Sequence, residues 1–211
     1  MPIITLTTDF GLKDHFLGSV KGALYQDIPD VKIVDISNNI SPFNIIEAAY
    51  IIENSYKNFP AGSIHIIGVD SEFNVEKKHL VIFLDEHYFI CADNGILSLL
   101  CNKIMPEKIV EINIYDNKNT TFPVLDVFVK VAAHIERGGS VDLVGTKTEK
   151  IIDVYEINPI VNNKKNEIIG HVIYIDNYGN VVLNITRNIF EKFGKSRPYV
   201  INARNYKFNK I

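Results

Sequence analysis

Short runs rich in isoleucine and valine alternate with longer segments of helical spacing along most of the chain, and this alternation constrains the fold most strongly. The short runs are almost continuously apolar, which is typical of strands buried on both faces. In the longer segments apolar residues recur every three or four positions, which predicts helices. Strand and helix in alternation predict an α/β layer architecture with a largely parallel sheet. The predicted strands are Ile3–Thr7, Val31–Ile36, Ser63–Val69, Leu80–Leu84 and Ile109–Ile114, and the predicted helices are Asp14–Gln26, Asn44–Asn58 and Val124–Arg137.

The pattern changes from about Ile151, where short β-like runs are separated by Asn, Lys and Gly and by a turn signal at Tyr178-Gly179-Asn180. We expect an N-terminal α/β/α domain over residues 1–157 and a small C-terminal β domain over residues 165–211. The polar stretch Asn158–Asn166 would join them. A second domain of this size is too small to hold a core alone, so it should pack on the first domain or on a neighbouring subunit.

Composition and charge exclude several function classes. There are 22 Lys and Arg against 25 Asp and Glu, and no basic stripe, so a nucleic-acid partner is not expected. The apolar runs are much shorter than the ~20 residues of a membrane helix, and no charged segment precedes an apolar one at the N-terminus. We therefore expect a cytoplasmic protein without a membrane partner. Cys91 and Cys101 have no metal-ligand or disulfide spacing, and the histidines are scattered, so no metal site is expected.

Acidic residues recur where predicted strands end or pass: Asp9, Asp35, Asp70 and Asp93. In open α/β sheets ligands bind at the carboxyl ends of the strands, so these carboxylates could face one pocket. The alternative is that each one caps a helix or shapes a turn. His65 is not expected to partner Asp70, because strand periodicity turns them to opposite faces. Phosphate-binding glycine motifs are absent from the sequence, so a nucleoside-like ligand should lack phosphates.

Several short motifs follow one another along nearly the whole chain, and together they resemble those of one known family. They are Thr7-Thr8-Asp9-Phe10-Gly11, Gly18-Ser19-Val20-Lys21-Gly22, Ile33-Val34-Asp35-Ile36, Ile40-Ser41-Pro42-Phe43-Asn44, Phe59-Pro60-Ala61-Gly62, Val69-Asp70, Ala92-Asp93-Asn94-Gly95 and Asp176-Asn177-Tyr178-Gly179-Asn180. This ordered set resembles the S-adenosyl-L-methionine hydroxide adenosyltransferase family, the relatives of fluorinase and chlorinase.

The resemblance implies a large N-terminal α/β domain, a smaller C-terminal β domain and a homotrimer. It also implies that S-adenosylmethionine binds between the large domain of one subunit and the small domain of the next. The family chemistry is attack of water, or of halide in specialised branches, on the ribose C5′ with methionine as leaving group. S-adenosylmethionine would be the substrate or ligand, and no cofactor would be needed.

The resemblance also assigns binding roles. Asp9 resembles the carboxylate that takes both ribose hydroxyls, which suits its two acceptor oxygens. Phe43 and Phe122 resemble aromatic walls of the sugar and nucleophile pocket, and core packing is the alternative for both. Asp176 and Asn180 resemble the groups that hold the methionine ammonium and carboxylate, and Tyr178 takes a position that is usually aromatic.

Two motifs depart from the water-using members of the family. Their Asp-Pro-Gly-Val-Gly-Thr-x-Arg motif is Asp70-Ser71-Glu72-Phe73-Asn74-Val75-Glu76-Lys77 here, so Lys77 or its neighbour Lys78 replaces the arginine. Their Thr-Phe-His-Gly-Arg-Asp motif is Thr121-Phe122-Pro123-Val124-Leu125-Asp126, so proline replaces the histidine. Lysine lacks the planar fork of arginine, and proline cannot carry a proton. The C-terminal domain is also expected to be shorter than in the family, which leaves the adenine end of the pocket incomplete.

Three hypotheses remain open. In the first, the protein hydrolyses S-adenosylmethionine to adenosine and methionine, with Asp70 orienting water and Lys77 as its charged helper. In the second, Pro123 and Leu125 mark a catalytically impaired adenosyl-ligand-binding or regulatory homologue. In the third, the chain is an unrelated doubly wound hydrolase that binds no adenosyl compound.

Overall fold

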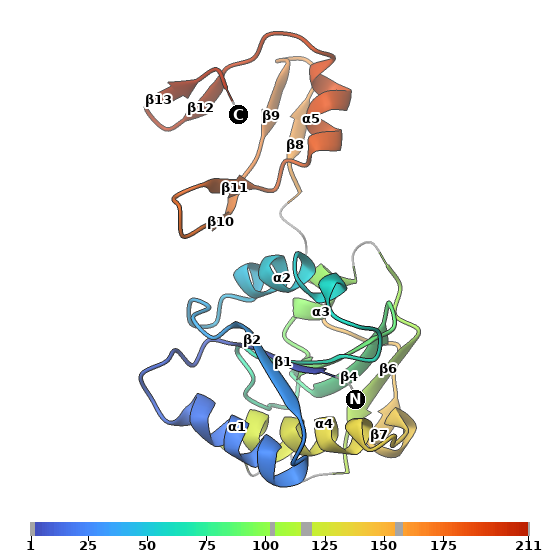
Figure 1. Ribbon diagram of the computed structural model, residues 1–211. Coiled ribbons are helices and arrows are strands. Elements are labelled where there is room, and N and C mark those ends of the chain that lie inside the picture. Colours follow the sequence, from blue (N-terminus) through green and yellow to red (C-terminus); the bar gives the residue numbers. More distant parts are fainter. Residues whose placement is uncertain (1–2, 102–103, 115–119, 155–157, 211) are drawn as a thin grey trace. The chain divides into compact units, whose positions relative to one another are not determined.

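The computed structural model describes residues 3–101, 104–114, 120–154 and 158–210, and the chain divides into two compact units (Figure 1). The first unit is Met1–Tyr155 and the second is Glu156–Ile211. Each unit is described by itself below. Among the described residues, every helix is too short or too polar to cross a bilayer.

The first unit is built on a seven-stranded sheet of order β2-β1-β3-β5-β4-β6-β7. Strands β2, β1, β3 and β5 pair in parallel, and β4, β6 and β7 follow through antiparallel pairings. Because β6 is antiparallel to β4, it runs in the direction of the parallel set. The expected α/β architecture with a mostly parallel sheet is confirmed. The strands are β1 Ile3–Thr8, β2 Lys32–Ser37, β3 Ile64–Gly68, β4 His79–Leu84, β5 His87–Ala92, β6 Lys108–Ile112 and β7 Gly145–Lys147.

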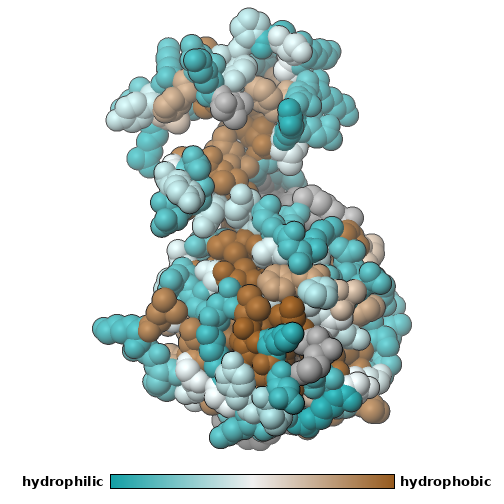
Figure 2. Space-filling view, in the orientation of Figure 1, coloured by the Kyte–Doolittle hydropathy of each residue, from teal (hydrophilic) through white to brown (hydrophobic). Residues whose placement is uncertain are grey.

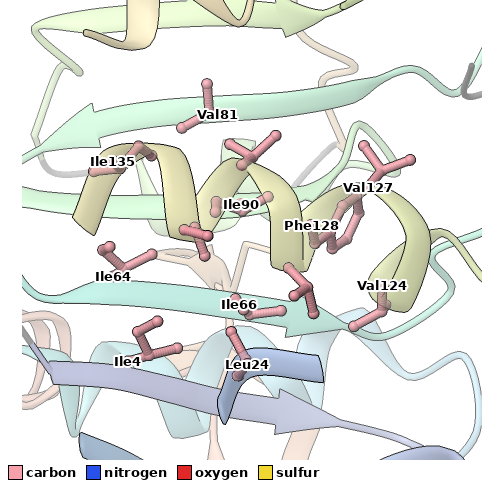
Figure 3. Packing of buried hydrophobic residues seen from close by; sticks show 14 of the residues in the cluster. Ile4, Leu24, Ile64, Ile66, Val81, Ile90, Val124, Val127, Phe128 and Ile135 are labelled. Carbon is pink, nitrogen blue, oxygen red and sulfur yellow. The ribbon is translucent and has the colours of Figure 1, made fainter. Parts of the chain in front are cut away.

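Helices cover both faces of this sheet (Figure 1). Helices α1 (Phe16–Asp27) and α4 (Val129–Glu136) lie on one face, and α2 (Ile45–Glu53) and α3 (Ile96–Leu100) lie on the other. Each face has its own buried apolar cluster, because neighbouring strand residues point to opposite sides. Figure 3 shows the α1/α4 side, where Phe128 and Ile135 pack over Ile64, Ile66 and Ile90.

Two of the predicted helices are interrupted. The predicted helix Asn44–Asn58 ends early, because Asn54 Nδ2 and Ser55 Oγ bond the carbonyls of Tyr50 and Ile51, and a short 3₁₀ turn η1 (Tyr56–Asn58) follows. The predicted helix Val124–Arg137 begins as a π-helical segment η2 (Val124–Phe128) that continues into α4. Periodicity alone does not distinguish these variants from one regular helix. A further 3₁₀ turn, η3, spans Val141–Leu143.

The described residues of the second unit, 158–210, form short hairpins and one helix. The hairpins are β8–β9 (Ile160–Asn162, Glu167–Ile169), β10–β11 (Val172–Ile175, Val181–Leu183) and β12–β13 (Ile201–Ala203, Tyr206–Phe208), with α5 at Arg187–Gly194. Strand β8 lies in the stretch that was expected to be a linker, because the side chain of Asn162 accepts hydrogen bonds from the turn amides of Lys164 and Lys165.

None of the described residues of the second unit is buried. Large apolar side chains such as Ile160, Val172 and Ile175 are more than half exposed, and brown surface is visible on this unit in Figure 2. This agrees with the expectation that so small a unit holds no core of its own.

Candidate functional site

The centre of the candidate site is the carboxylate of Asp9, which directly follows β1. Thr8 and Gly68 pair at the ends of β1 and β3, so the residues after them start from the same edge of the sheet. Oδ2 of Asp9 accepts a hydrogen bond from the amide of Phe43 at 2.9 Å and a long one from the amide of Asp70 at 3.5 Å. The structure therefore brings together Asp9, Phe43 and Asp70, as the strand-end argument predicted for the two acids.

Both amide donors belong to residues in the left-handed backbone region. Phe43 has φ 63° and Asp70 has φ 46°, which is uncommon for residues other than glycine. Such conformations persist only where surrounding contacts hold them, and they concentrate at functional sites. Oδ1 of Asp9 accepts no hydrogen bond within the described parts of the chain. That oxygen is available to a ligand hydroxyl.

Lys77 pairs with Asp70. Its Nζ lies 2.7 Å from Asp70 Oδ1, whereas Lys78 lies 3.7 Å from Glu111 instead. Asn74 sets this arrangement, because its Oδ1 accepts from the amides of Glu76 and Lys77 and folds the loop into a tight turn. Of the two lysines that the sequence offered, Lys77 is therefore the one that pairs with Asp70.

The two aromatic residues differ in their surroundings. Phe43 is 69% exposed, so core packing is the wrong interpretation for it. Phe122 is half-buried and packs edge-on against Phe10 and Phe16, with ring centroids 5.5 and 5.2 Å away. The three rings pack on one another, and Phe10 and Phe122 also pack against the core cluster of the α1/α4 side. For Phe122 the structure therefore supports the alternative of core packing.

The motif Thr121–Asp126, in which proline replaces the family histidine, leads into the η2 segment. Pro123 and Val124 are buried, and Leu125 packs against the core cluster of the α1/α4 side. π-helical turns inside longer helices occur often at functional sites. Neither Pro123 nor Leu125 offers a polar side-chain group, so any water beside Asp70 has to be held by other residues.

A histidine that sequence reasoning did not single out lies below the Asp70 loop. His79 is completely buried at the start of β4, and its Nε2 lies 3.0 Å from the carbonyl oxygen of Ser71. Its ring packs edge-on against Phe73 and Phe128. Burial lowers the pKa of His79 to about 4, with the nearby Lys77 charge acting in the same direction, so the ring is neutral at pH 7. Only the folded contacts distinguish it from the other histidines.

The remaining strand acids do not join the site. Asp35 lies within β2 rather than at its end and pairs with Lys21 at 2.6 Å. Asp93 is buried, accepts a hydrogen bond from the amide of Ile152, and has a pKa raised by burial. These two acids therefore have partners of their own away from Asp9 and Asp70, an ion pair for Asp35 and a loop amide for Asp93, rather than the helix cap or turn of the alternative. His65 bonds Thr5 and His87, which confirms that it does not partner Asp70.

Asp176, Tyr178 and Asn180 form a cluster of their own within the second unit. They lie in the turn between β10 and β11, where Asp176 Oδ1 accepts from the amides of Tyr178 and Asn180. Asp176 Oδ2 accepts from Asn180 Nδ2 at 2.7 Å, and these bonds lower the pKa of Asp176. Tyr178 is 90% exposed. The turn presents a carboxylate that stays ionised and an aromatic ring open to contact.

The described residues include no group of three or more His, Cys, Asp or Glu arranged to hold a metal ion. Cys91 and Cys101 are both free thiols, and burial raises the pKa of each. Cys91 lies in the core on the α2/α3 side and behaves as a small apolar residue.

Comparison with known proteins agrees with this geometry. The model of the SAM hydroxide adenosyltransferase N-terminal domain matches residues 4–145, and that of the C-terminal domain matches residues 170–211. A protein of Methanocaldococcus jannaschii named (R)-S-adenosyl-L-methionine hydrolase is 32% identical over 89% of this chain and 68% of its own length. A fluorinase of Nocardia brasiliensis is 22% identical over 92% of this chain and 74% of its own length. A crystal structure of a conserved protein from Thermotoga maritima superposes with a TM-score of 0.85 at 28% identity, covering 98% of this chain and 81% of that one. The chain belongs to the S-adenosyl-L-methionine hydroxide adenosyltransferase family.

Proposed function

We propose that the protein hydrolyses S-adenosylmethionine to adenosine and L-methionine by attack of water on the ribose C5′. The observation that carries this proposal is the Asp70 carboxylate, paired with Lys77 at 2.7 Å and tied through its amide to Asp9. A carboxylate held in one orientation beside a ribose-binding carboxylate is suited to orient a water molecule toward C5′.

Each residue has a defined task in this scheme. Asp9 accepts hydrogen bonds from the ribose hydroxyls through Oδ1, and the exposed ring of Phe43 lies against the sugar. Asp70 accepts a hydrogen bond from the attacking water, and Lys77 fixes the position of that carboxylate. The C5′–S bond breaks as the new C5′–O bond forms, and the proton of the water passes to solvent.

The chemistry places a modest demand on acid–base groups. The leaving group is a neutral thioether that departs from a sulfonium, so it needs little acid assistance. Orientation of the water and its partial desolvation by the wall at Phe122 supply much of the catalysis. This is why a site without the family histidine is still competent in our proposal. For the same reason we propose that no metal or other cofactor takes part, and dialysis against a chelator should leave the activity unchanged.

We further propose that Asp176, Tyr178 and Asn180 bind the methionine end of the substrate. The ionised Asp176 suits the ammonium group of methionine, and Asn180 suits its carboxylate.

Following the family, we propose a homotrimer in which this turn and the Asp9–Asp70 site come from neighbouring subunits. The absence of buried residues in the described part of the second unit supports such packing, and analytical ultracentrifugation tests the trimer. The free thiols support a cytoplasmic location.

The decisive experiment is incubation of the purified protein with millimolar S-adenosylmethionine and chromatographic measurement of adenosine and methionine. Equimolar products are expected, and Asp70→Ala should lower their rate of release by about 100-fold or more while leaving a measurable residual rate from substrate orientation and binding. Asp35→Ala is the matched control, because it removes a strand acid whose ion pair with Lys21 lies outside the site. Intact substrate with the wild type, or full activity in Asp70→Ala, would overturn the proposal.

A second candidate function is binding of an adenosyl ligand without turnover, and the proline at the family histidine position favours it. Under this alternative, calorimetry detects binding of S-adenosylmethionine while no adenosine appears. Pro123→His then discriminates between explanations. A large gain in adenosine release would show that this position limits catalysis, whereas a folded, ligand-binding variant without gain would place the limit elsewhere.

A further inference from the structure

Asn94 makes a specific pair of hydrogen bonds to the backbone around Asp70. Its Nδ2 donates to the carbonyl oxygen of Val69 at 3.0 Å and to that of Asp70 at 3.2 Å. Its Oδ1 accepts from the amide of Ile96 at 3.1 Å, which orients the side-chain amide. Asn94 follows β5, the strand next to β3, so two neighbouring strand ends are joined through one side chain.

These bonds coincide with the strained residue. Asp70 has φ 46°, a conformation that L-residues other than glycine adopt at a cost. A single NH₂ group thus contacts the carbonyls of Val69 and Asp70, which precede and follow the bend at Asp70. The backbone bend also fixes the direction in which the Asp70 side chain leaves the chain, toward Lys77. Loss of Asn94 leaves two part-buried carbonyls without this donor and removes the contact that opposes relaxation.

The turn that carries Asn94 is itself constrained. Gly95 has φ 96°, and a β carbon at this position would lie 1.9 Å from Cγ2 of Val154. The turn between Asn94 and α3 therefore has room only for glycine at position 95.

We infer that Asn94 is a positioning residue for the proposed reaction: it holds Asp70 in the left-handed conformation that aims its carboxylate at Lys77 and at the attacking water. This inference rests on the proposed function for its kinetic consequence, whereas its structural consequence stands independently. Asn94 touches neither substrate nor water in this scheme and acts only through Asp70.

The kinetic test is a double-mutant cycle in S-adenosylmethionine hydrolysis. Asn94→Ala should lower kcat by about 10- to 100-fold while KM changes less than about twofold, since the loss of two hydrogen bonds acts on Asp70 and not on ribose binding. Asn94→Asp, which lacks the amide donors, should behave alike. In an Asp70→Ala background Asn94→Ala should cost nothing further. Equal losses in both backgrounds would show a general structural role and overturn the inference.

The structural test does not depend on activity. In a crystal structure of Asn94→Ala, φ of Asp70 should leave the left-handed region and the Asp70–Lys77 distance should exceed 4 Å. An unchanged bend and ion pair would overturn the inference even if the wild type hydrolyses the substrate, and a wild type without activity would refute only the proposed function. Asn54→Ala is the matched control, because it deletes an amide-to-carbonyl bond, Asn54 Nδ2 to Tyr50 O, that lies at the end of α2.

Discussion

Lys77 Nζ lies 2.7 Å from Asp70 Oδ1, and the two side chains are only 15% and 29% exposed. An ion pair shielded to this degree is screened by salt less than a surface pair, and a charge-assisted hydrogen bond is shorter and stronger than a neutral one. Lysine contributes a point charge to this pair and lacks the planar fork with which arginine contacts a carboxylate. The site therefore holds an acid and a cation in direct contact.

Removal of the Lys77 charge should lower catalysis through Asp70. We expect Lys77→Met to reduce kcat/KM by about 10- to 100-fold, the effect of losing one charge-assisted hydrogen bond of roughly 1.5–3 kcal/mol. Lys78→Met is the control of matched chemistry, because Lys78 lies beside Glu111 at 3.7 Å, away from Asp70. Steady-state assays of adenosine release check both variants. Equal effects of the two substitutions would contradict the assignment of Lys77.

Buried His79 should make the folded state sensitive to acid. Its pKa is lowered from 6.5 to about 4 by burial, so the unfolded chain binds the proton more readily than the folded one. Neutral His79 therefore does not weaken the fold above pH 6.5. As the pH falls from 6.5 toward 4, proton binding to the unfolded chain lowers the free energy of unfolding by up to about 3 kcal/mol. Urea unfolding at several pH values measures this slope.

The comparison for His79 is between slopes rather than absolute stabilities. His79→Gln should flatten the fall in unfolding free energy between pH 6.5 and 4, whatever it does to stability at pH 7. Asn54→Ala should leave the fall unchanged, because it removes an uncharged side chain that bonds the Tyr50 carbonyl at the end of α2. A wild-type slope retained in His79→Gln would mean that another group, such as the buried His65, carries the acid sensitivity.

Two glycine-to-alanine substitutions should have opposite signs. Gly95→Ala places a β carbon 1.9 Å from Val154 Cγ2 at φ 96°, so it should destabilise the fold by about 2–4 kcal/mol. Gly22→Ala, in the middle of α1 with nothing within 4 Å of the new carbon, should stabilise it by about 0.5–1 kcal/mol. Thermal or urea unfolding of the two variants decides. A neutral Gly95→Ala would show that Val154 moves aside easily.

The framework of the site could be predicted from the sequence, because strand ends and motif order are local features. The positions of Asp9 and Asp70 follow from where β1 and β3 end, and their proximity follows from parallel pairing. The same argument failed for Asp35 and Asp93, because an acid inside a strand can form an ion pair, as Asp35 does with Lys21, and an acid after a strand can anchor a loop, as Asp93 does with Ile152. Sequence pattern does not say which neighbour a carboxylate will meet.

The support of the site was beyond prediction for a different reason. The roles of Asn94 and His79 depend on contacts between strand ends, Asn94 with the Asp70 backbone and His79 with Ser71. Phe43 and Asp70 have left-handed backbones whose amides bond Asp9, a residue far away in the sequence. Phe and Asp seldom adopt this conformation, so the sequence does not indicate it. Lys77 rather than Lys78 pairs with Asp70 because of the turn at Asn74. A shift of one residue in this loop would exchange the two lysines.

Phe43 and Phe122 offer the sharpest separation of binding from packing, because the resemblance assigned both to aromatic walls. Phe43 is 69% exposed, so Phe43→Ala should change the unfolding free energy by less than about 0.5 kcal/mol. It should weaken S-adenosylmethionine binding, since in the proposed function this ring lies against the sugar. Phe122 packs on Phe10 and Phe16, so Phe122→Ala should destabilise the protein by about 2 kcal/mol.

Calorimetry and urea unfolding on the same two preparations, Phe43→Ala and Phe122→Ala, test this contrast. The structure predicts that the two effects fall on different variants, because the Phe43 ring is exposed and the Phe122 ring is held by its aromatic neighbours. Unchanged affinity in Phe43→Ala would remove this residue from the sugar pocket. A loss of stability as large as that of Phe122→Ala would instead mean that the Phe43 ring contributes to packing, and that its left-handed backbone is held by core contacts rather than by the carboxylate of Asp9.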